Sequence, residues 1–353
     1  MNTSAIKTKL GNAIICIEGS EELYREIERE ISFSKELNCD EIDIVYRFPE
    51  KIKANMRPDN FDVKFKNIFF DVYICNDRPT IVTIFIKTPL PFKLLRVLPE
   101  NMQRTCSVLL FKNLFTFDEY LSAKLLYDVF LCTTQHVIME KGQSYMHASA
   151  VADSNNCVYI FAGPSHCGKT SILNFMLMEN DSFRALSDDM LIIDNQGKAY
   201  LNDINMNINP FALLFREPLE TRFFENINYT EKILFKLFSF LGKYIIKRFP
   251  IAKIYDDHQL AREGNIRYYF YIHRTNTQDF RIQKIKPADF AWRTSHDLVK
   301  EIKNLSKCNN TKDIQGEIAD IHRHAIGEAE CYKMIIPASK SPIEIKELTQ
   351  EFF

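Results

Sequence analysis

Glycine is scarce in this sequence, and long apolar runs are missing. Only 10 of the 353 residues are glycine, under half of the usual share of roughly 7%, so we expect those that remain to stand where the backbone requires them. No uninterrupted apolar run approaches the roughly 18 residues that a membrane-spanning helix needs. Residues 1–10 are polar and lack the apolar core of a signal peptide. We therefore expect a soluble, cytoplasmic protein without a membrane-spanning helix.

Patterns typical of disulfide frameworks, zinc sites and nucleic-acid binding are missing as well. The nine cysteines are scattered without a C-x-x-C pair, which is not a disulfide framework in a chain of this size. His322 and His324 form an isolated H-x-H, whereas zinc takes three or four ligands. Lys and Arg number 45 and Asp and Glu 46, a net charge of −1, so nucleic acid is not an expected partner.

What the sequence does contain is an ordinary globular composition in a chain long enough for two domains. Apolar residues make up 46% and charged residues 26%, which excludes a mainly disordered chain. One compact domain usually holds roughly 100–200 residues. We predict a small α/β domain over 1–140, with an accessory or substrate-docking role, and a second domain over 141–353.

Alternating and apolar runs predict the elements of the first domain. Thr116 and Glu119 fit a capping box that opens a helix to about residue 141, and Gly142 marks its end. Ser20 caps a further predicted helix over 21–35. Strands are predicted at 12–17, 42–47, 61–75, 80–87 and 107–111.

One segment of the second domain carries chemistry. A strand over 157–161 is followed by G-x-x-x-x-G-K-[ST] and then by an apolar helical run from Ile172, the context that a phosphate-binding loop requires. Such a loop points backbone N–H groups and a helix N-terminus at phosphate oxygens. The predicted nucleotide-binding residues are Gly163, Pro164, Ser165, His166, Cys167, Gly168, Lys169, Thr170 and Ser171.

In the nucleotide-binding interpretation, the side chains of this loop have different roles. Lys169 adds a point charge for the β- and γ-phosphates, and Thr170 offers a hydroxyl to Mg²⁺. His166 is interpreted as an exposed loop residue. Cys167 stands at a helix N-terminus, where a thiol pKa can be depressed. The alternative for the whole segment is a loop without a ligand.

An acidic pair follows about 20 residues after the lysine. Asp188 and Asp189 precede the apolar run of 190–193, and a carboxylate at such a strand edge suits a metal held against phosphates. The alternative is a solvated pair at a loop-to-strand junction. We place both aspartates among the metal ligands and the catalytic residues.

The order of these motifs resembles a known group. H-A-S-A-V over 147–151, a strand, G-P-S-x-x-G-K-T and S-D-D are similar to the C-terminal domain of HPr kinase/phosphorylase. The similarity is greatest to the HPr kinase-like proteins of modified-peptide gene clusters, including lasso-peptide tailoring kinases; PEP carboxykinases share the fold more remotely. The resemblance covers 145–195 well and extends to a closing pattern at 331–337.

The resemblance implies roles for three residues. His147 matches a histidine that lies near the transferred phosphate. Asp188 and Asp189 match a pair in which one carboxylate binds metal and the other takes the proton of the acceptor hydroxyl; which does which stays open. Next to Mg²⁺ and Lys169 the base should remain ionised at pH 7. The loop has His166 and Cys167 in place of small residues, and the signature for HPr itself is missing, so HPr is not the expected substrate.

Together these features predict a kinase that uses ATP or another nucleotide with Mg²⁺. The predicted acceptor is a serine of a peptide or protein, such as a ribosomally made precursor peptide. A kinase of a small-molecule alcohol and a nucleotide-binding switch without transfer activity are the alternatives. The fold expected for 141–353 is the HPr kinase-like phosphate-loop domain, and a homo-oligomer is compatible with the resemblance.

Two further features concern phosphate charge and acceptor docking. Arg262, and less so Arg216, is a candidate for a phosphate clamp, and Glu263 is a weak candidate for a second metal contact. Residues 229–249 predict a basic amphipathic helix with a net charge of +4, from five Lys or Arg and one Glu. This insert is interpreted as a helix packed on the core, with an acceptor lid and a membrane contact as alternatives.

Overall fold

The computed structural model describes most of the chain. The described residues are 4–10, 12–19, 41–49, 61–111, 114–179, 181–202, 204, 206–208, 217–238, 246–249, 251–277, 279–302, 304–305, 313–340 and 344. The fold is mixed α/β. Two compact units share the chain: unit 1 holds residues 1–141 and 302–314, and unit 2 holds residues 142–301 and 315–353. The prediction assigns all of 141–353 to one domain, whereas 302–314 cluster with unit 1.

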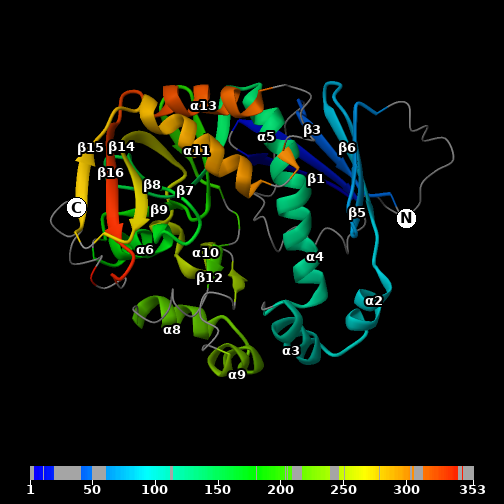
Figure 1. Cartoon of the computed structure of the whole chain (residues 1–353). Helices are drawn as coiled ribbons and strands as arrows, with labels where there is room; N and C mark the ends of the chain where they lie inside the picture. Colours follow the sequence, from blue (N-terminus) through cyan, green and yellow to red (C-terminus); the bar gives the residue numbers. More distant parts are fainter. Residues whose placement is uncertain are drawn as a thin grey trace. The chain divides into compact units, whose positions relative to one another are not determined.

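Unit 1 is built on a six-stranded mixed sheet (Figure 1). Its spatial order is β1-β2-β3-β6-β5-β4, with β3 parallel to both β2 and β6 and the other pairs antiparallel. Branched and aromatic side chains such as Ile44, Tyr46 and Val72 are buried in it. The strands are β1 (Ser4–Leu10), β2 (Ala13–Gly19), β3 (Ile44–Arg47), β4 (Val63–Lys66), β5 (Phe70–Cys75) and β6 (Thr80–Ile86).

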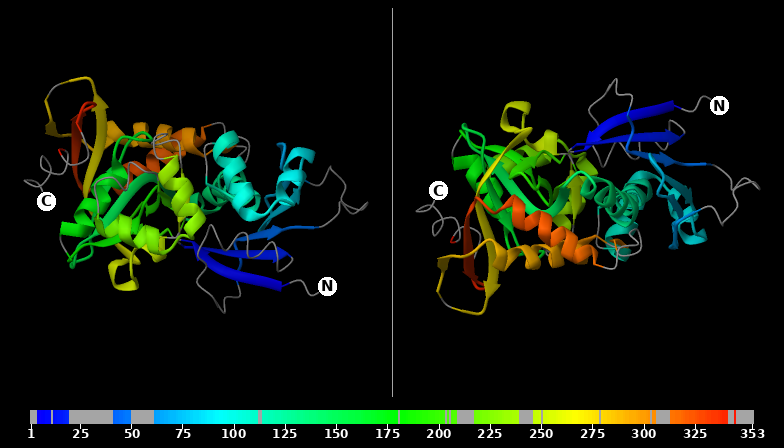
Figure 2. Two further views of the ribbon diagram at one scale, coloured as in Figure 1. Left: turned by 90° about the horizontal axis from the view of Figure 1, so that it is seen from below. Right: turned by 90° about the horizontal axis from the view of Figure 1, so that it is seen from above.

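A long helical run packs along this sheet, as Figures 1 and 2 show. It consists of α4 (Phe117–Leu125), the π-helical turn η2 (Leu126–Phe130) and α5 (Leu131–Met139). Tyr46 of β3 anchors it, because its hydroxyl lies 2.6 Å from Thr133 Oγ1 and its ring centroid lies 4.0 Å from that of Phe130. The predicted end at Gly142 is confirmed, since this glycine has a φ of 70°. The helices α2 (Leu90–Arg96) and α3 (Glu100–Phe111) precede this run.

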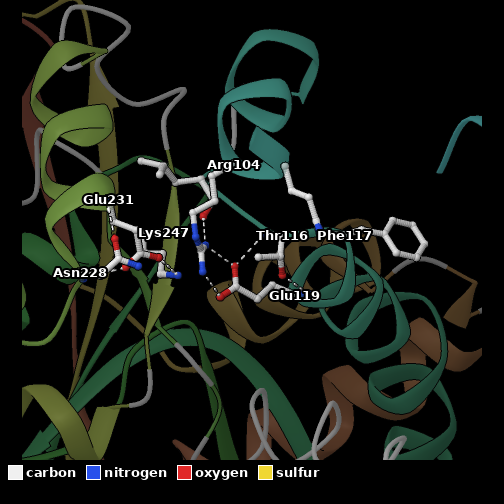
Figure 3. Close-up of polar contacts among 9 residues, drawn as sticks. Arg104, Thr116, Phe117, Glu119, Asn228, Glu231 and Lys247 are labelled. Atoms are coloured by element: carbon white, nitrogen blue, oxygen red, sulfur yellow. Dashed lines mark hydrogen bonds and ion pairs between the residues drawn. The ribbon is translucent and has the colours of Figure 1, made fainter. Parts of the chain in front are cut away.

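The predicted capping box is confirmed and is tied to a buried arginine. Thr116 Oγ1 accepts a bond from the Glu119 amide at 3.2 Å, and Glu119 Oε2 accepts one from the Thr116 amide at 2.9 Å. Arg104 of α3 donates to both oxygens of Glu119, at 2.7 and 3.1 Å (Figure 3). The start of α4 is therefore fixed both by local chemistry and by a neighbouring helix.

Two predicted strands of unit 1 differ from the structure, and one predicted helix is not tested. The strand predicted over 61–75 is the antiparallel pair of β4 and β5. Residues 107–111 form the last turn of α3 instead of a strand, because Arg104 and the buried Gln103 anchor the helix that contains them. A five-residue apolar run does not by itself distinguish a strand from a buried helix segment. The helix predicted over 21–35 lies outside the described residues.

Unit 2 is built on an eight-stranded sheet (Figures 1 and 2). Its main path is β11-β10-β7-β8-β14-β16-β15, with β9 paired to β7. A further pairing of β11 with β14 closes a ring of five strands. The strands are β7 (Gln143–Ala152), β8 (Cys157–Ala162), β9 (Arg184–Ser187), β10 (Met190–Asp194), β11 (Lys198–Tyr200), β14 (Glu263–Thr275), β15 (Arg281–Lys284) and β16 (Glu330–Pro337).

Strand β7 lies at the centre of the core of unit 2. All ten of its residues are buried, which is typical of a strand covered on both faces. Met146, Ala148 and Ala150 belong to an apolar cluster with Tyr271 of β14 and Phe290 of α11. Alternation along the strand turns His147 and Ser149 to the other face. The main helices are α6 (Lys169–Glu179), α11 (Ala288–Glu301) and α13 (Ile314–Ala325).

The basic insert is only in part the predicted helix. Helix α9 (Tyr229–Leu237) covers its start, capped by Asn228 and Glu231 (Figure 3), whereas β13 (Lys247–Phe249) pairs with β12 (Met206–Ile208). Lys247, predicted on a solvated face, is buried, and its Nζ lies 2.8 Å from Glu231 Oε1. Lys247 can be buried because Glu231 neutralises its charge. Residues 239–245 lie outside the described ones.

Three short helices complete this part of unit 2. They are α8 (Glu217–Glu225), α10 (Ile251–Ile254) and the 3₁₀ turn η4 (Asp257–Gln259). Across the described ranges, no helix combines the length and the apolar character that a crossing of a membrane requires.

The H-x-H pair has no metal-ligand geometry. His322 is fully buried, with Nδ1 2.8 Å from Thr294 Oγ1 and Nε2 2.9 Å from the Tyr145 carbonyl oxygen, whereas His324 is exposed. No group of three His, Cys, Asp or Glu among the described residues could hold a metal ion. Burial lowers the pKa of His322 from its usual 6.5 to about 4. His322 is therefore a neutral structural link between β7, α11 and α13.

The lowered pKa of His322 predicts a loss of stability in mild acid. As pH falls below about 6.5, the unfolded chain binds a proton that the folded chain refuses, so the free energy of unfolding falls until about pH 4 and not further. The shift of the pKa to about 4 corresponds to about 3 kcal/mol over this window. Urea unfolding at pH 7, 5.5 and 4 measures it. H322Q is the control: its own pH dependence should be smaller by this amount, and equal slopes in both proteins would contradict the assignment.

Helix α9 separates buried from exposed apolar residues, which gives a second prediction. Phe235 is buried, with its ring centroid 5.0 Å from that of Phe223, whereas Leu237 is 63% exposed. F235A should therefore lower the free energy of unfolding by about 3–5 kcal/mol, and L237A should change it by less than about 0.5 kcal/mol. Chemical denaturation of both variants measures these changes in the free energy of unfolding. A large loss in L237A would show that its side chain packs on the core.

Candidate functional site

A glycine-containing loop joins β8 to α6 at the carboxyl end of the sheet. Strand β8 ends at Ala162, and Lys169 is the first residue of α6, so the predicted strand, loop and helix are confirmed. Three residues of the loop have positive φ: Gly163 at 146°, His166 at 66° and Gly168 at 111°. A Cβ atom at position 163 would lie 2.5 Å from the Ile272 carbonyl oxygen, so only glycine fits beside β14.

Lys169 lies folded over this loop. Its Nζ donates to the carbonyl oxygens of Gly163, at 2.9 Å, and of Pro164, at 3.1 Å, and the residue is buried. Pro164, Ser165 and His166 are exposed at the rim. The loop thus places a cation over a curved stretch of backbone, which is an arrangement that suits an anion.

Asp188 connects the loop to the sheet. It stands in the turn between β9 and β10 and is 5% exposed. Its Oδ1 accepts hydrogen bonds from Ser149 Oγ at 2.7 Å and from Thr170 Oγ1 at 2.9 Å. The oxygen atoms of Thr170 and Asp188 are the hard donors that Mg²⁺ prefers beside phosphates, so the residues fit this metal.

Burial raises the pKa of Asp188, and the neighbouring charge of Asp189 raises it further. The bonds from Ser149 and Thr170 and the charge of Lys169 oppose this shift. Desolvation therefore outweighs the polar partners of Asp188.

Asp189 faces the other way, toward His147. Its Oδ1 lies 3.1 Å from His147 Nε2, and the histidine is 4% exposed. Asp189 has a φ of 109°, a conformation that non-glycine residues adopt only when their surroundings impose it. The Ala148 amide, which donates to the Asp189 carbonyl at 3.0 Å, helps to impose it. His147, Asp188 and Asp189, predicted together, do meet in one place.

A residue that the sequence did not indicate completes this group. Glu301, at the end of α11, has its Oε1 3.7 Å from His147 Nδ1 and accepts a hydrogen bond from Ser165 Oγ. About 150 residues separate it from both partners. Because it belongs to no motif, no local signal could have identified it.

The predicted phosphate clamp Arg262 does not lie at the loop. The parallel register of β14 and β8 pairs Asn265 with Cys157 and Tyr271 with Ala162. Arg262, just before β14, is therefore beyond the opposite end of β8, roughly 30 Å from the loop at the rise of a strand. The neighbouring Glu263 pairs with Lys198 at 3.6 Å at that end, and Arg216 lies outside the described residues.

Arg274, near the carboxyl end of β14, is a cation on the correct side. Its charge acts on Cys167 of the loop, and its Nη2 donates to the Lys340 carbonyl at 2.9 Å. Its Nε is buried with no hydrogen-bond partner in the described part of the chain. Burial raises the thiol pKa of Cys167, and the charges of Lys169 and Arg274 offset this rise only in part. The expected lowering of the Cys167 pKa is therefore wrong.

Comparison with known proteins finds a likeness among solved structures. No family model matches the sequence, and no curated protein is significantly similar to it. Among solved structures, the chain is similar to the Hpr(Ser) kinase/phosphatase from Coxiella burnetii, with 10% sequence identity and a TM-score of 0.28. The match covers 59% of this chain and 95% of the other. A TM-score this low leaves the function to be argued from the residues of the site.

The positive φ of Asp189 predicts that glycine is more stable there than alanine. D189A and D189G remove the same carboxylate, but only glycine adopts a φ of 109° without strain. D189G should have a free energy of unfolding higher than that of D189A by about 1 kcal/mol, measured by urea titration. D188A and D188G are the control, because Asp188 lacks a positive φ. Here the alanine variant should have the higher free energy of unfolding. An order shared by both positions would contradict strain at Asp189.

Proposed function

We propose that unit 2 is a phosphotransferase that moves a phosphoryl group from ATP, or another nucleoside triphosphate, to a hydroxyl group with the help of Mg²⁺. One observation carries this proposal: two consecutive aspartates face different partners. Asp188 is bonded to Thr170 of the loop, and Asp189 lies against His147. Phosphoryl transfer needs both functions, a metal held against phosphates and a group that takes the acceptor's proton.

The loop residues would bind the triphosphate. Loop amides surround the phosphates in such an arrangement, and Lys169 exchanges the carbonyls of Gly163 and Pro164 for phosphate oxygens. Thr170 and Asp188 would hold Mg²⁺, which supplies charge neutralisation at the bridging oxygens. Arg274 replaces Arg262 as the candidate for a second cation near the loop.

Asp189 and His147 would act on the acceptor. As the acceptor oxygen forms its bond to phosphorus and the bond to the leaving nucleoside diphosphate breaks, Asp189 accepts the hydroxyl proton. His147 stands within 3.1 Å of that carboxylate and can share the proton. In this proposal Asp188 is the metal ligand and Asp189 is the general base. The sequence alone left this assignment open.

A serine of a peptide or protein is the proposed acceptor. Its support is the motif order of 147–189, which resembles that of HPr kinase-like proteins found with modified-peptide genes. We propose a scaffold or docking role for residues 1–140, whose sequence contains no motif for chemistry. A small-molecule alcohol would use the same site residues.

A nucleotide-binding switch without transfer activity is the rival from another class. Such a protein needs the link between Thr170 and Asp188 but has no use for a second carboxylate beside a buried histidine. The strained backbone of Asp189 favours the enzyme, because such strain is retained where geometry serves function.

Lys169 provides the test of nucleotide binding. In the wild type, saturating Mg·ATP should raise the melting temperature, because a ligand of the folded state stabilises it by mass action. K169A should lose this rise in melting temperature, because the charge of Lys169 is the one that would bind the phosphates. Without nucleotide, its free energy of unfolding should be lower by about 1 kcal/mol, because the hydrogen bonds of Lys169 to the loop carbonyls are lost. K198A, which removes a lysine at the far end of the sheet, should respond like the wild type.

Transfer itself is read by incubating the wild type with labelled ATP and candidate peptides, followed by mass measurement. Transfer that K169A abolishes supports the phosphotransferase. A K169A protein that binds Mg·ATP as tightly as the wild type would overturn the phosphate-loop assignment. Nucleotide binding with neither transfer nor hydrolysis would favour the switch.

A further inference from the structure

Glu301 lies against both halves of the site. Its Oε1 accepts a hydrogen bond from Ser165 Oγ of the loop and lies 3.7 Å from His147 Nδ1. That nitrogen is buried and has no hydrogen-bond partner among the residues that the structure describes. A buried ring nitrogen without a partner is costly, and Glu301 is a carboxylate within one short side-chain movement of it.

Helix α11 holds Glu301 in this place. Phe290, Thr294, Asp297 and Glu301 follow one another at intervals of three or four residues, so they share one face of the helix. Phe290 packs on Tyr271, with ring centroids 4.8 Å apart, and Asp297 accepts a bond from the Tyr271 hydroxyl at 3.0 Å. Thr294 Oγ1 lies 2.8 Å from His322. Glu301 is thus the last residue of an anchored face and not a loosely held surface group.

We infer that Glu301 is a positioning residue that fixes the ring of His147 and connects it to the phosphate-binding loop. The inference rests on the proposed function and deepens it. With Asp189 at Nε2 and Glu301 at Nδ1, the imidazole has a carboxylate at each nitrogen, and these neighbours decide which nitrogen carries the proton. In the structure the proton lies on Nε2, which is 3.1 Å from Asp189 Oδ1, while Ser165 engages Glu301. A proton on Nδ1 directed at Glu301 leaves Nε2 able to accept the proton that Asp189 takes up.

This orientation matters at the moment of transfer. The acceptor hydroxyl gives its proton to Asp189 while its oxygen bonds to phosphorus and the nucleoside diphosphate leaves. Nε2 of His147 can then share that proton, and the ring becomes a cation between two carboxylates. Glu301 stabilises this cation through Nδ1–H, as the third group does when it orients a base in other catalytic sites.

Ser165 makes the arrangement depend on the loop. Without a phosphate, its hydroxyl donates to the same Oε1 that would accept from His147. When the loop holds a phosphate, Ser165 can donate to a phosphate oxygen, which frees Oε1 to approach Nδ1. Glu301 therefore couples occupancy of the loop to the orientation of His147.

The experiment measures the ring nitrogens of His147 directly. Full-length protein with ¹⁵N-labelled histidine is recorded by NMR as wild type, E301M, E301Q and D289N, and H147Q assigns the signals. E301M keeps the side-chain length but removes the acceptor, E301Q retains a neutral acceptor, and D289N removes an exposed charge elsewhere on α11. Spectra with and without Mg·ADP test the effect of loop occupancy.

Without nucleotide we expect wild type and D289N to carry the proton on Nε2, which faces Asp189. Mg·ADP should increase the population with the proton on Nδ1. E301M should lose this increase, and E301Q should recover part of it. Turnover of Mg·ATP should fall about 10-fold in E301M, as for other carboxylates that orient a functional histidine, while the Kd of Mg·ADP changes less than twofold.

The outcomes separate this inference from the proposed function. Ring signals in E301M that equal those of the wild type overturn the positioning role, and so does unchanged turnover. If the signals change as expected but the wild type neither hydrolyses nor transfers phosphate, the contact between Glu301 and His147 stands and the phosphotransferase assignment fails.

Discussion

The carboxylate of Asp188 is the point on which the site of unit 2 depends. A single oxygen atom accepts hydrogen bonds from Ser149 of β7 and from Thr170 of α6. Three elements distant in sequence, the central strand, the loop helix and the turn between β9 and β10, are thereby held to one another. Because the residue is buried, leaving that oxygen without partners would cost several kcal/mol, so loop and turn have little freedom to separate.

The site also contains strain and desolvation that a merely stable protein would avoid. Asp189 has a backbone conformation suited to glycine, and burial raises the pKa of Asp188. His147 has a buried nitrogen with no hydrogen-bond partner among the residues described in the structure. Each of these costs free energy in the absence of a ligand. Their concentration within one turn, one strand and one loop is typical of a functional site, where phosphates and a metal ion would offset them.

Much of the fold could be predicted because its signals are local. The capping box of Thr116 and Glu119 and the period-two pattern of Phe70–Cys75 involve neighbours in the sequence. The wrong predictions concern residues whose structure depends on contacts with other elements. Residues 107–111 became a helix through side chains that Arg104 and Gln103 extend to another element. Lys247 became a buried strand residue through Glu231, which lies 16 positions earlier.

The sequence by itself determined the loop, its lysine and the acidic pair, because spacing within a short segment suffices to place them on a strand, a turn and a helix N-terminus. Only the tertiary structure decided which cation stands near the loop and which carboxylate lies behind His147. The register of β14 against β8 puts Arg274 at the loop and Arg262 at the far end, and the packing of α11 brings Glu301 to the histidine. Strand register and helix packing arise from contacts between residues more than a hundred positions apart, which no spacing in the sequence records.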